Sequence, residues 1–149
     1  MIERVVASWF GTGLVLRRIR GSDGGSGTVG AALALAMAYA LAPVGWWAQL
    51  AAAVVVTGLA LWSIRPFVDE GDPGWVVVDE AAGMFVASIG LGGWPLLVAF
   101  LVFRIADITK RFPGVAAAER LDGAVGITAD DLVAGLYGLA AGWAVAVLA

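Results

Sequence analysis

The chain has 149 residues, of which 61% are hydrophobic, 14% are charged and 21 are glycine, and its net charge is −3. Soluble domains contain about 25% charged residues, so this composition favours a protein embedded in a lipid bilayer. The absence of cysteine and histidine excludes disulfides, thiol nucleophiles, Ser-His-Asp triads and zinc sites built on those ligands, and the mixed charges offer no surface for nucleic acid. The length suits one domain, residues 1–149.

The first 27 residues are expected to lie at the membrane surface. Their apolar stretch is interrupted by two glycines and followed by three arginines rather than by the small residues of a cleavage site. We therefore expect an interfacial segment with Trp9 and Phe10 in lipid and the arginines at the headgroups. This segment ends in a Gly/Ser-rich loop, and Thr28 is expected to cap the first helix of a helical core, residues 28–149.

Three uncharged runs predict five apolar helices. Pro43 and Gly45 break the run at 28–64, the turn residues of 90–95 break the run at 81–103, and a last run covers 132–149. The first run leaves helices of about 15 and 19 residues, near the ~20 that cross a bilayer. The sequence predicts an all-α fold, a compact bundle of apolar helices in two hairpins plus a C-terminal helix, embedded in a membrane. A compact soluble bundle is the alternative.

All charged side chains fall in segments that such a bundle places at one end. They lie in 1–23, 65–80, 104–111 and 119–131, whereas the turns expected at the other end carry no charge and contain Trp46, Trp47 and Trp94. Basic residues mark the cytoplasmic side of a membrane protein, and tryptophans favour the interfaces. We therefore expect a one-sided site at the cytoplasmic face.

The first polar cluster opens the run at 81–103. Asp72 and Pro73 suggest a helix start, and Asp79 and Glu80 then begin the apolar pattern. Gly83 falls between the two carboxylates in azimuth one turn later, which would let a neighbouring helix approach beneath them. Ionisable residues at this depth are functional candidates, although ordinary interfacial charges are the alternative.

The second cluster places Arg104, Asp107, Lys110 and Arg111 on one helical face, within an arc of roughly 120°. The cations could bind a phosphate while Asp107 holds a metal. An Arg104–Asp107 pair within the helix, with the other cations as membrane anchors, is the alternative.

The third cluster enters the last apolar helix. Thr128 is expected as its N-cap, with Asp130 and Asp131 in the first turn and Gly135 permitting close packing one turn on. A Thr-x-x-Asp capping box offers a purely structural explanation. Together the three clusters supply carboxylates beside cations, without nitrogen or sulfur ligands, which favours Mg²⁺ or Mn²⁺ and phosphoryl chemistry on an amphiphile.

Five motifs in order carry a family resemblance: F-G-T-G at 10–13, G-T-x-G at 27–30, D-P-G-W-x-x-x-D-E-x-x-G-M at 72–84, F-R-x-x-D-x-x-K at 103–110 and G-x-x-G-I-x-x-D-D-x-x-A-G at 123–135. The sequence resembles the phosphatidylglycerophosphatase A family. The resemblance implies a Mg²⁺-dependent phosphatase that converts the phospholipid phosphatidylglycerophosphate to phosphatidylglycerol at the cytoplasmic face of a bacterial inner membrane.

The resemblance also implies roles for particular residues. Metal-binding or catalytic roles pass to five carboxylates, and our hypothesis is that they hold one or two Mg²⁺ ions: Asp79, Glu80, Asp107, Asp130 and Asp131. Arg104 and Lys110 would neutralise the phosphate while water attacks phosphorus in line. The stretch Lys110-Arg111-Phe112-Pro113 departs from the family's usual K-P-W-P, which affects the expected shape of that loop.

Two other functions remain as alternatives. A small transporter subunit or membrane scaffold would use intramembrane carboxylates without phosphatase activity. A CDP-alcohol phosphotransferase would need D-G-x-x-A-R, but Asp122-Gly123 is not followed by Ala-Arg. The number of subunits stays open.

Overall fold

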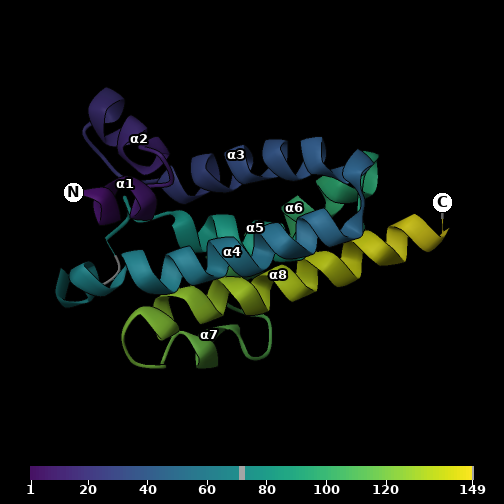
Figure 1. The fold of residues 1–149 in the computed structure, drawn as a ribbon. Helices are drawn as coiled ribbons and strands as arrows, with labels where there is room; N and C mark the ends of the chain where they lie inside the picture. The colour runs from purple at the N-terminus through teal and green to yellow at the C-terminus, as the bar shows by residue number, and fades with distance from the viewer. Residues whose placement is uncertain (71–72, 149) are drawn as a thin grey trace.

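The computed structural model describes residues 1–70 and 73–148, and within these ranges it is helical without any strand. The all-α prediction is therefore confirmed (Figure 1). The elements in chain order are α1 (Ile2–Ala7), α2 (Thr12–Arg20), α3 (Ser26–Leu41), the 3₁₀ turn η1 (Ala42–Val44), α4 (Trp46–Ser63), the 3₁₀ turn η2 (Arg65–Glu70), α5 (Val78–Ser88), α6 (Gly93–Thr109), α7 (Val115–Ala118) and α8 (Gly123–Leu148).

The short helix α5 forms the centre of the bundle. Helices α3, α4 and α8 pack against it, and α6 packs on α8. Both predicted hairpins are present, α3 with α4 and α5 with α6, although α3 and α4 pack mainly on α5 rather than on each other. With 11 residues, α5 is about 16 Å long, far short of the ~30 Å hydrocarbon layer. It is a core helix surrounded by longer ones.

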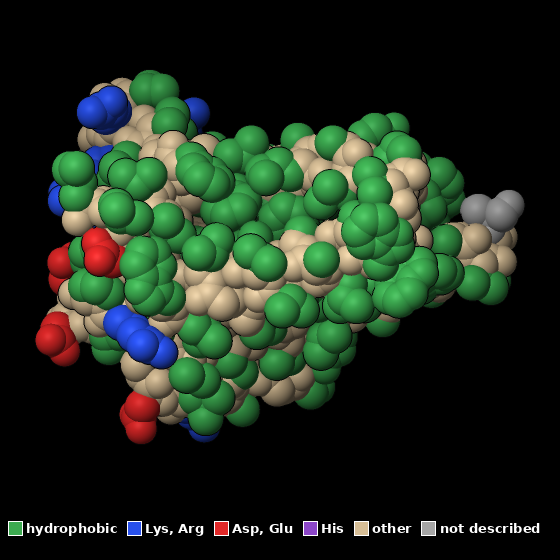
Figure 2. Space-filling view, viewed as in Figure 1, with side chains coloured by type: hydrophobic (Ala, Val, Ile, Leu, Met, Phe, Trp, Pro, Cys, Tyr) green, Lys and Arg blue, Asp and Glu red, His purple; other side chains and the backbone are tan. Residues whose placement is uncertain are grey.

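Three helical segments are long and apolar enough to cross a membrane: Ser26–Val44, Trp46–Ser63 and Gly123–Leu148. The predicted separation of charge is also confirmed. On the face shown in Figure 2, the acidic and basic side chains gather at the end where α1 and α2 lie, and the rest is mostly hydrophobic. Trp46, Trp47 and Trp94 are more than half exposed on segments away from that end.

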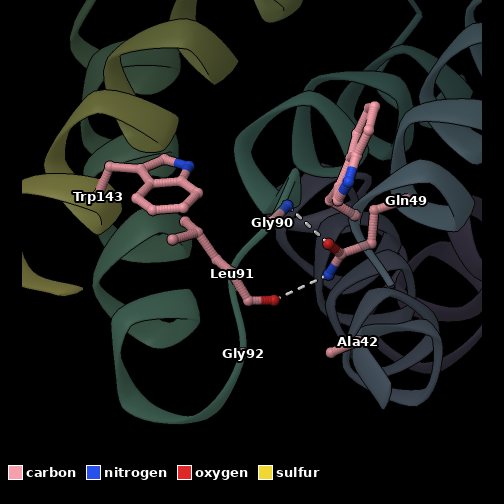
Figure 3. A pocket seen from close by; sticks show the side chains of 7 residues that line it. Ala42, Gln49, Gly90, Leu91, Gly92 and Trp143 are labelled. Carbon is pink, nitrogen blue, oxygen red and sulfur yellow. Dashed lines mark hydrogen bonds between the residues drawn. The ribbon is translucent and has the colours of Figure 1, made fainter. Parts of the chain in front are cut away.

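A buried amide joins the two hairpins at the uncharged end. The Gln49 Nε2 group on α4 donates to the Leu91 carbonyl at 2.8 Å and to the Ala38 carbonyl at 3.2 Å. Its Oε1 atom accepts from the Gly90 N–H at 2.8 Å (Figure 3). Because backbone groups without water must be paired inside the protein, these bonds fix the turn between α5 and α6 against α3 and α4.

Helix starts differ from the sequence predictions at two places. Helix α3 begins at Ser26 after Gly25, which adopts a left-handed φ of +89°, so Thr28 is inside the helix and not its cap. Helix α8 begins at Gly123, and the Thr128 hydroxyl donates to the Ala124 carbonyl at 2.8 Å. The predicted N-caps at both threonines are wrong, because flanking glycines let each helix start earlier.

The start of α5 also differs. Asp72 lies outside the described residues. Pro73 is the first residue of a turn in which the Val76 N–H donates to the Pro73 carbonyl at 2.8 Å. The helix begins only at Val78, so the predicted start at Pro73 is wrong.

The N-terminal segment packs on the start of α5. The Val77 N–H donates to the Ala7 carbonyl at 2.9 Å. Trp9 is 2% exposed and meets the Phe85 ring edge-on, with 6.2 Å between centroids, whereas Phe10 is 63% exposed. The expectation that Trp9 lies in lipid is therefore wrong, because its ring fills a space in the core.

Candidate metal and phosphate site

Three carboxylates converge inside the charged end of the bundle. Asp79 and Glu80 belong to the first turn of α5, and Asp131 comes from α8. One oxygen from each lies within 4.8 Å of the others, and Asp79 and Asp131 are 3% and 4% exposed. This buried group can hold a metal ion.

Two glycines bring α5 and α8 close enough for this convergence. A Cβ on Gly83 would lie 2.6 Å from the Asp131 carbonyl oxygen and 2.7 Å from the Phe103 ring. A Cβ on Gly135 would overlap the Gly83 carbonyl. The close helix approach expected at Gly83 and Gly135 is confirmed, and it sets the distance between the carboxylates of the two helices.

The chemistry of the three donors fits a hard divalent cation. All are carboxylates, the ligands that Mg²⁺ prefers. The Oδ1 atom of Asp131 is buried and has no hydrogen-bond partner among the described residues. A buried carboxylate is costly unless a cation or donors compensate it, so the position of this oxygen suits a ligand of a bound cation.

A buried arginine lies beside the carboxylates. Arg104 on α6 is 8% exposed, and its Nη1 is 2.6 Å from Asp107 Oδ2. Its Nη2 donates to the Thr28 hydroxyl at 3.5 Å. A Cβ on Gly27 would overlap the Glu80 carboxylate and lie 3.1 Å from Arg104 Nη2. The guanidinium and Glu80 therefore meet at the N-terminus of α3, and the intrahelical Arg104–Asp107 pair is present.

Lys110 reaches α8 from the end of α6. It has a left-handed φ of +51°, and its Nζ bonds Asp130 Oδ2 at 2.9 Å and also the Glu119 carboxylate. Burial tends to lower the pKa of Lys110, but hydrogen bonds and negative charge from Glu119 and Asp130 outweigh it and raise the pKa above its ordinary value. Lys110 therefore remains a cation.

The predicted four-residue face on α6 is only partly correct. Helix α6 ends at Thr109, and Arg111 is exposed beyond it. The left-handed turn at Lys110 breaks the helical azimuth, so only Arg104 and Asp107 share the face. Glu119, which pairs with Lys110, was not predicted from the sequence. Lys110 and Glu119 do not belong to one helix, so no helical spacing relates them.

These features define a class: a small helical membrane protein with a buried acidic centre and paired cations at one end. The chain belongs to the phosphatidylglycerophosphatase A family, whose model matches residues 5–146.

Two curated relatives carry the name of this family, and a third carries the name of another lipid phosphatase. A putative phosphatidylinositol-3-phosphatase of Bacteroides thetaiotaomicron is 34% identical over 98 residues, 61% of either chain. The phosphatidylglycerophosphatase A of Haemophilus influenzae is 41% identical over 69 residues, 44% of this chain and 42% of the relative. That of Escherichia coli is 32% identical over 118 residues, 74% and 67% of the two chains. The chain thus spans less than two thirds of the first two relatives, and no solved structure matches it significantly.

Proposed function

We propose that this chain is a Mg²⁺-dependent lipid phosphatase that hydrolyses the terminal phosphate monoester of phosphatidylglycerophosphate to give phosphatidylglycerol and inorganic phosphate. The reaction takes place at the charged end, which faces the cytoplasm of a bacterial inner membrane. The observation that carries the proposal is the buried group Asp79, Glu80 and Asp131 beside Arg104, in a chain of this family.

Asp79, Glu80 and Asp131 would hold the Mg²⁺ ion, which supplies Lewis acidity to a phosphoryl oxygen and to water. Arg104 presents a forked donor that matches phosphate oxygens. Water attacks phosphorus, the bond from phosphorus to the glycerol oxygen breaks, and that oxygen takes up a proton.

Asp107 and Asp130 act in this proposal through the cations that they hold. The Asp107 carboxylate fixes the Arg104 guanidinium, and the Asp130 carboxylate fixes the Lys110 ammonium near the same end of α8. Oriented charges cost little reorganisation when negative charge develops on the phosphoryl group. The ion pairs support a positioning role for both carboxylates.

The identity of the lipid headgroup is inferred from the family and the relatives. Two relatives are named phosphatidylglycerophosphatase A and one a putative phosphatidylinositol-3-phosphatase, and these names share a phosphate monoester on a lipid headgroup. We assign phosphatidylglycerophosphate because the family model and the two relatives agree on it.

The test is phosphate release from each lipid by the purified protein in detergent micelles, with Mg²⁺ or with EDTA. We expect Mg²⁺-dependent release from phosphatidylglycerophosphate, and its loss in Asp131→Asn without loss of folding. Release only from the inositol lipid would overturn the headgroup, and release in EDTA would overturn the metal. No release from either lipid would favour a transporter subunit or scaffold.

A further inference from the structure

An apolar groove of about 320 Å³ lies between α4 and α8, with α5 as its floor. Its size falls within the range of about 300–1,000 Å³ typical of ligand sites. Figure 1 shows α4 and α8 in front of α5. The lining comes from α4, α5 and α8 and includes Leu50, Val54, Thr57, Val86, Leu132 and Leu136. Among the residues that the structure describes, those that line the groove carry no charge.

The surroundings of the groove determine what can fill it. Both walls belong to helices long and apolar enough to cross a membrane, and the rim residues Val54 and Leu136 are 66% and 56% exposed. The groove therefore opens toward hydrocarbon. Apolar hollows do not hold water, and an empty one forfeits dispersion contacts, so a hydrocarbon chain is the occupant that this environment favours.

The groove is aligned with the carboxylate centre. Leu132 directly follows Asp131 on α8, and Leu136 lies about one turn further on. On α5, Val86 comes seven residues after Asp79, which places it on nearly the same stripe of the helix and about 10 Å deeper. The groove thus leads from the centre toward the uncharged end, the direction in which a phospholipid with its phosphate at the centre extends its chains.

We propose that this groove binds one acyl chain of the phospholipid whose phosphate occupies the carboxylate centre. The inference rests on the proposed function and adds a second subsite to it, one that recognises the hydrocarbon of the substrate. The chain of a bystander membrane lipid is the competing occupant that the experiment must separate.

Leu136→Trp obstructs the groove, and because Leu136 also borders a second hollow on α8, Val54→Trp on the opposite wall serves as a second groove variant. Leu101→Trp is the matched control for both. Leu136 and Leu101 are 56% and 57% exposed, but Leu101 lies on α6 and lines none of the described hollows. With long-chain phosphatidylglycerophosphate in micelles, we expect Leu136→Trp to raise KM about threefold to tenfold. The change is modest because a displaced chain stays in hydrocarbon and loses only packing contacts. We expect Leu101→Trp to leave KM unchanged.

The deacylated headgroup separates this subsite from the chemistry. Leu136→Trp should hydrolyse glycerophosphoglycerophosphate like the wild type, because this substrate has no chain to place. Equal KM values for the two tryptophan variants would overturn the proposal. The proposal would also be overturned if Leu136→Trp and Val54→Trp, on the opposite wall, each slowed hydrolysis of the long-chain lipid and of the deacylated headgroup equally.

Photolabelling tests the occupant without relying on activity. A phosphatidylglycerophosphate with a photoreactive acyl chain should label the groove walls on α4 and α8 in the wild type and in Leu101→Trp, and label them less in Leu136→Trp. Equal labelling by a photoreactive phosphatidylcholine would identify a bystander lipid and overturn the proposal. If the wild type releases no phosphate, the proposed function fails, while the labelling pattern still decides whether the groove holds this lipid.

Discussion

Gly83→Ala should disable the site without changing any polar residue. The added Cβ would lie 2.6 Å from the Asp131 carbonyl oxygen, whereas ordinary contacts of this kind begin at 3.4 Å, so α5 and α8 must separate by roughly 0.8 Å. Overpacking costs about 1–3 kcal/mol, and alanine returns up to about 1 kcal/mol of helix propensity. With the full propensity gain, we expect a net loss of up to about 2 kcal/mol in the free energy of unfolding.

The effect on activity should be much larger than the effect on stability. The separation moves Asp131 away from Asp79 and Glu80, whose oxygens now lie within 4.8 Å of it. A misplacement of about 1 Å can cost about 100-fold in rate, so kcat should fall by about that factor while the protein stays folded.

The assay is Mg²⁺-dependent phosphate release together with thermal unfolding in the same detergent. Gly58→Ala on α4 is the matched control, because no atom lies within 4 Å of its added Cβ, and it should be fully active and slightly more stable. Normal activity in Gly83→Ala would refute the argument that this helix contact sets the geometry of the site.

Three further substitutions test separate parts of the molecule. Asp107→Asn should abolish phosphate release in a protein that remains folded by thermal unfolding, and full activity would contradict the role given to its pair with Arg104. Glu119→Gln should change the free energy of unfolding by less than about 1 kcal/mol, since Glu119 is half exposed; a larger loss in denaturant unfolding would show a buried network. Gln49→Leu should destabilise by roughly 2–4 kcal/mol, because it leaves the Gly90 N–H and the Leu91 carbonyl unpaired, yet KM should not change.

Helix positions and the one-sided charge distribution could be predicted from the sequence because lipid imposes them. Uncharged runs broken at Pro43 and near Gly90 correspond to the observed turns, and the charges collect at one end as expected. Helix starts could not be predicted from capping residues. Thr128 bonds the carbonyl four residues back, because Gly123 allows the helix to begin a turn and a half earlier.

The pairing of the carboxylates could not be predicted either, because it depends on which helices are neighbours. Asp130 and Asp131 are adjacent in sequence, yet Asp130 turns to Lys110 while Asp131 joins Asp79 and Glu80. Helical azimuth separates them by about 100°, but only the positions of α5 and α6 decide what each one meets. The left-handed conformation of Lys110, which brings its side chain to α8, could not be predicted because no sequence pattern indicates it.

The shortness of α5 explains how a chain with so few charges buries an acidic centre. Because α5 has 11 residues and longer helices surround it, its first turn lies inside the bundle while still at the charged end. The N-terminal segment completes this enclosure: the Ala7 carbonyl accepts the Val77 N–H just before Asp79, and Trp9 packs on Phe85. A segment that composition alone suggests is a surface anchor therefore also packs on the start of α5. Gly13 of the F-G-T-G motif at 10–13 belongs to this contact, because a Cβ there would overlap the Trp75 carbonyl and meet the Val77 side chain just before Asp79.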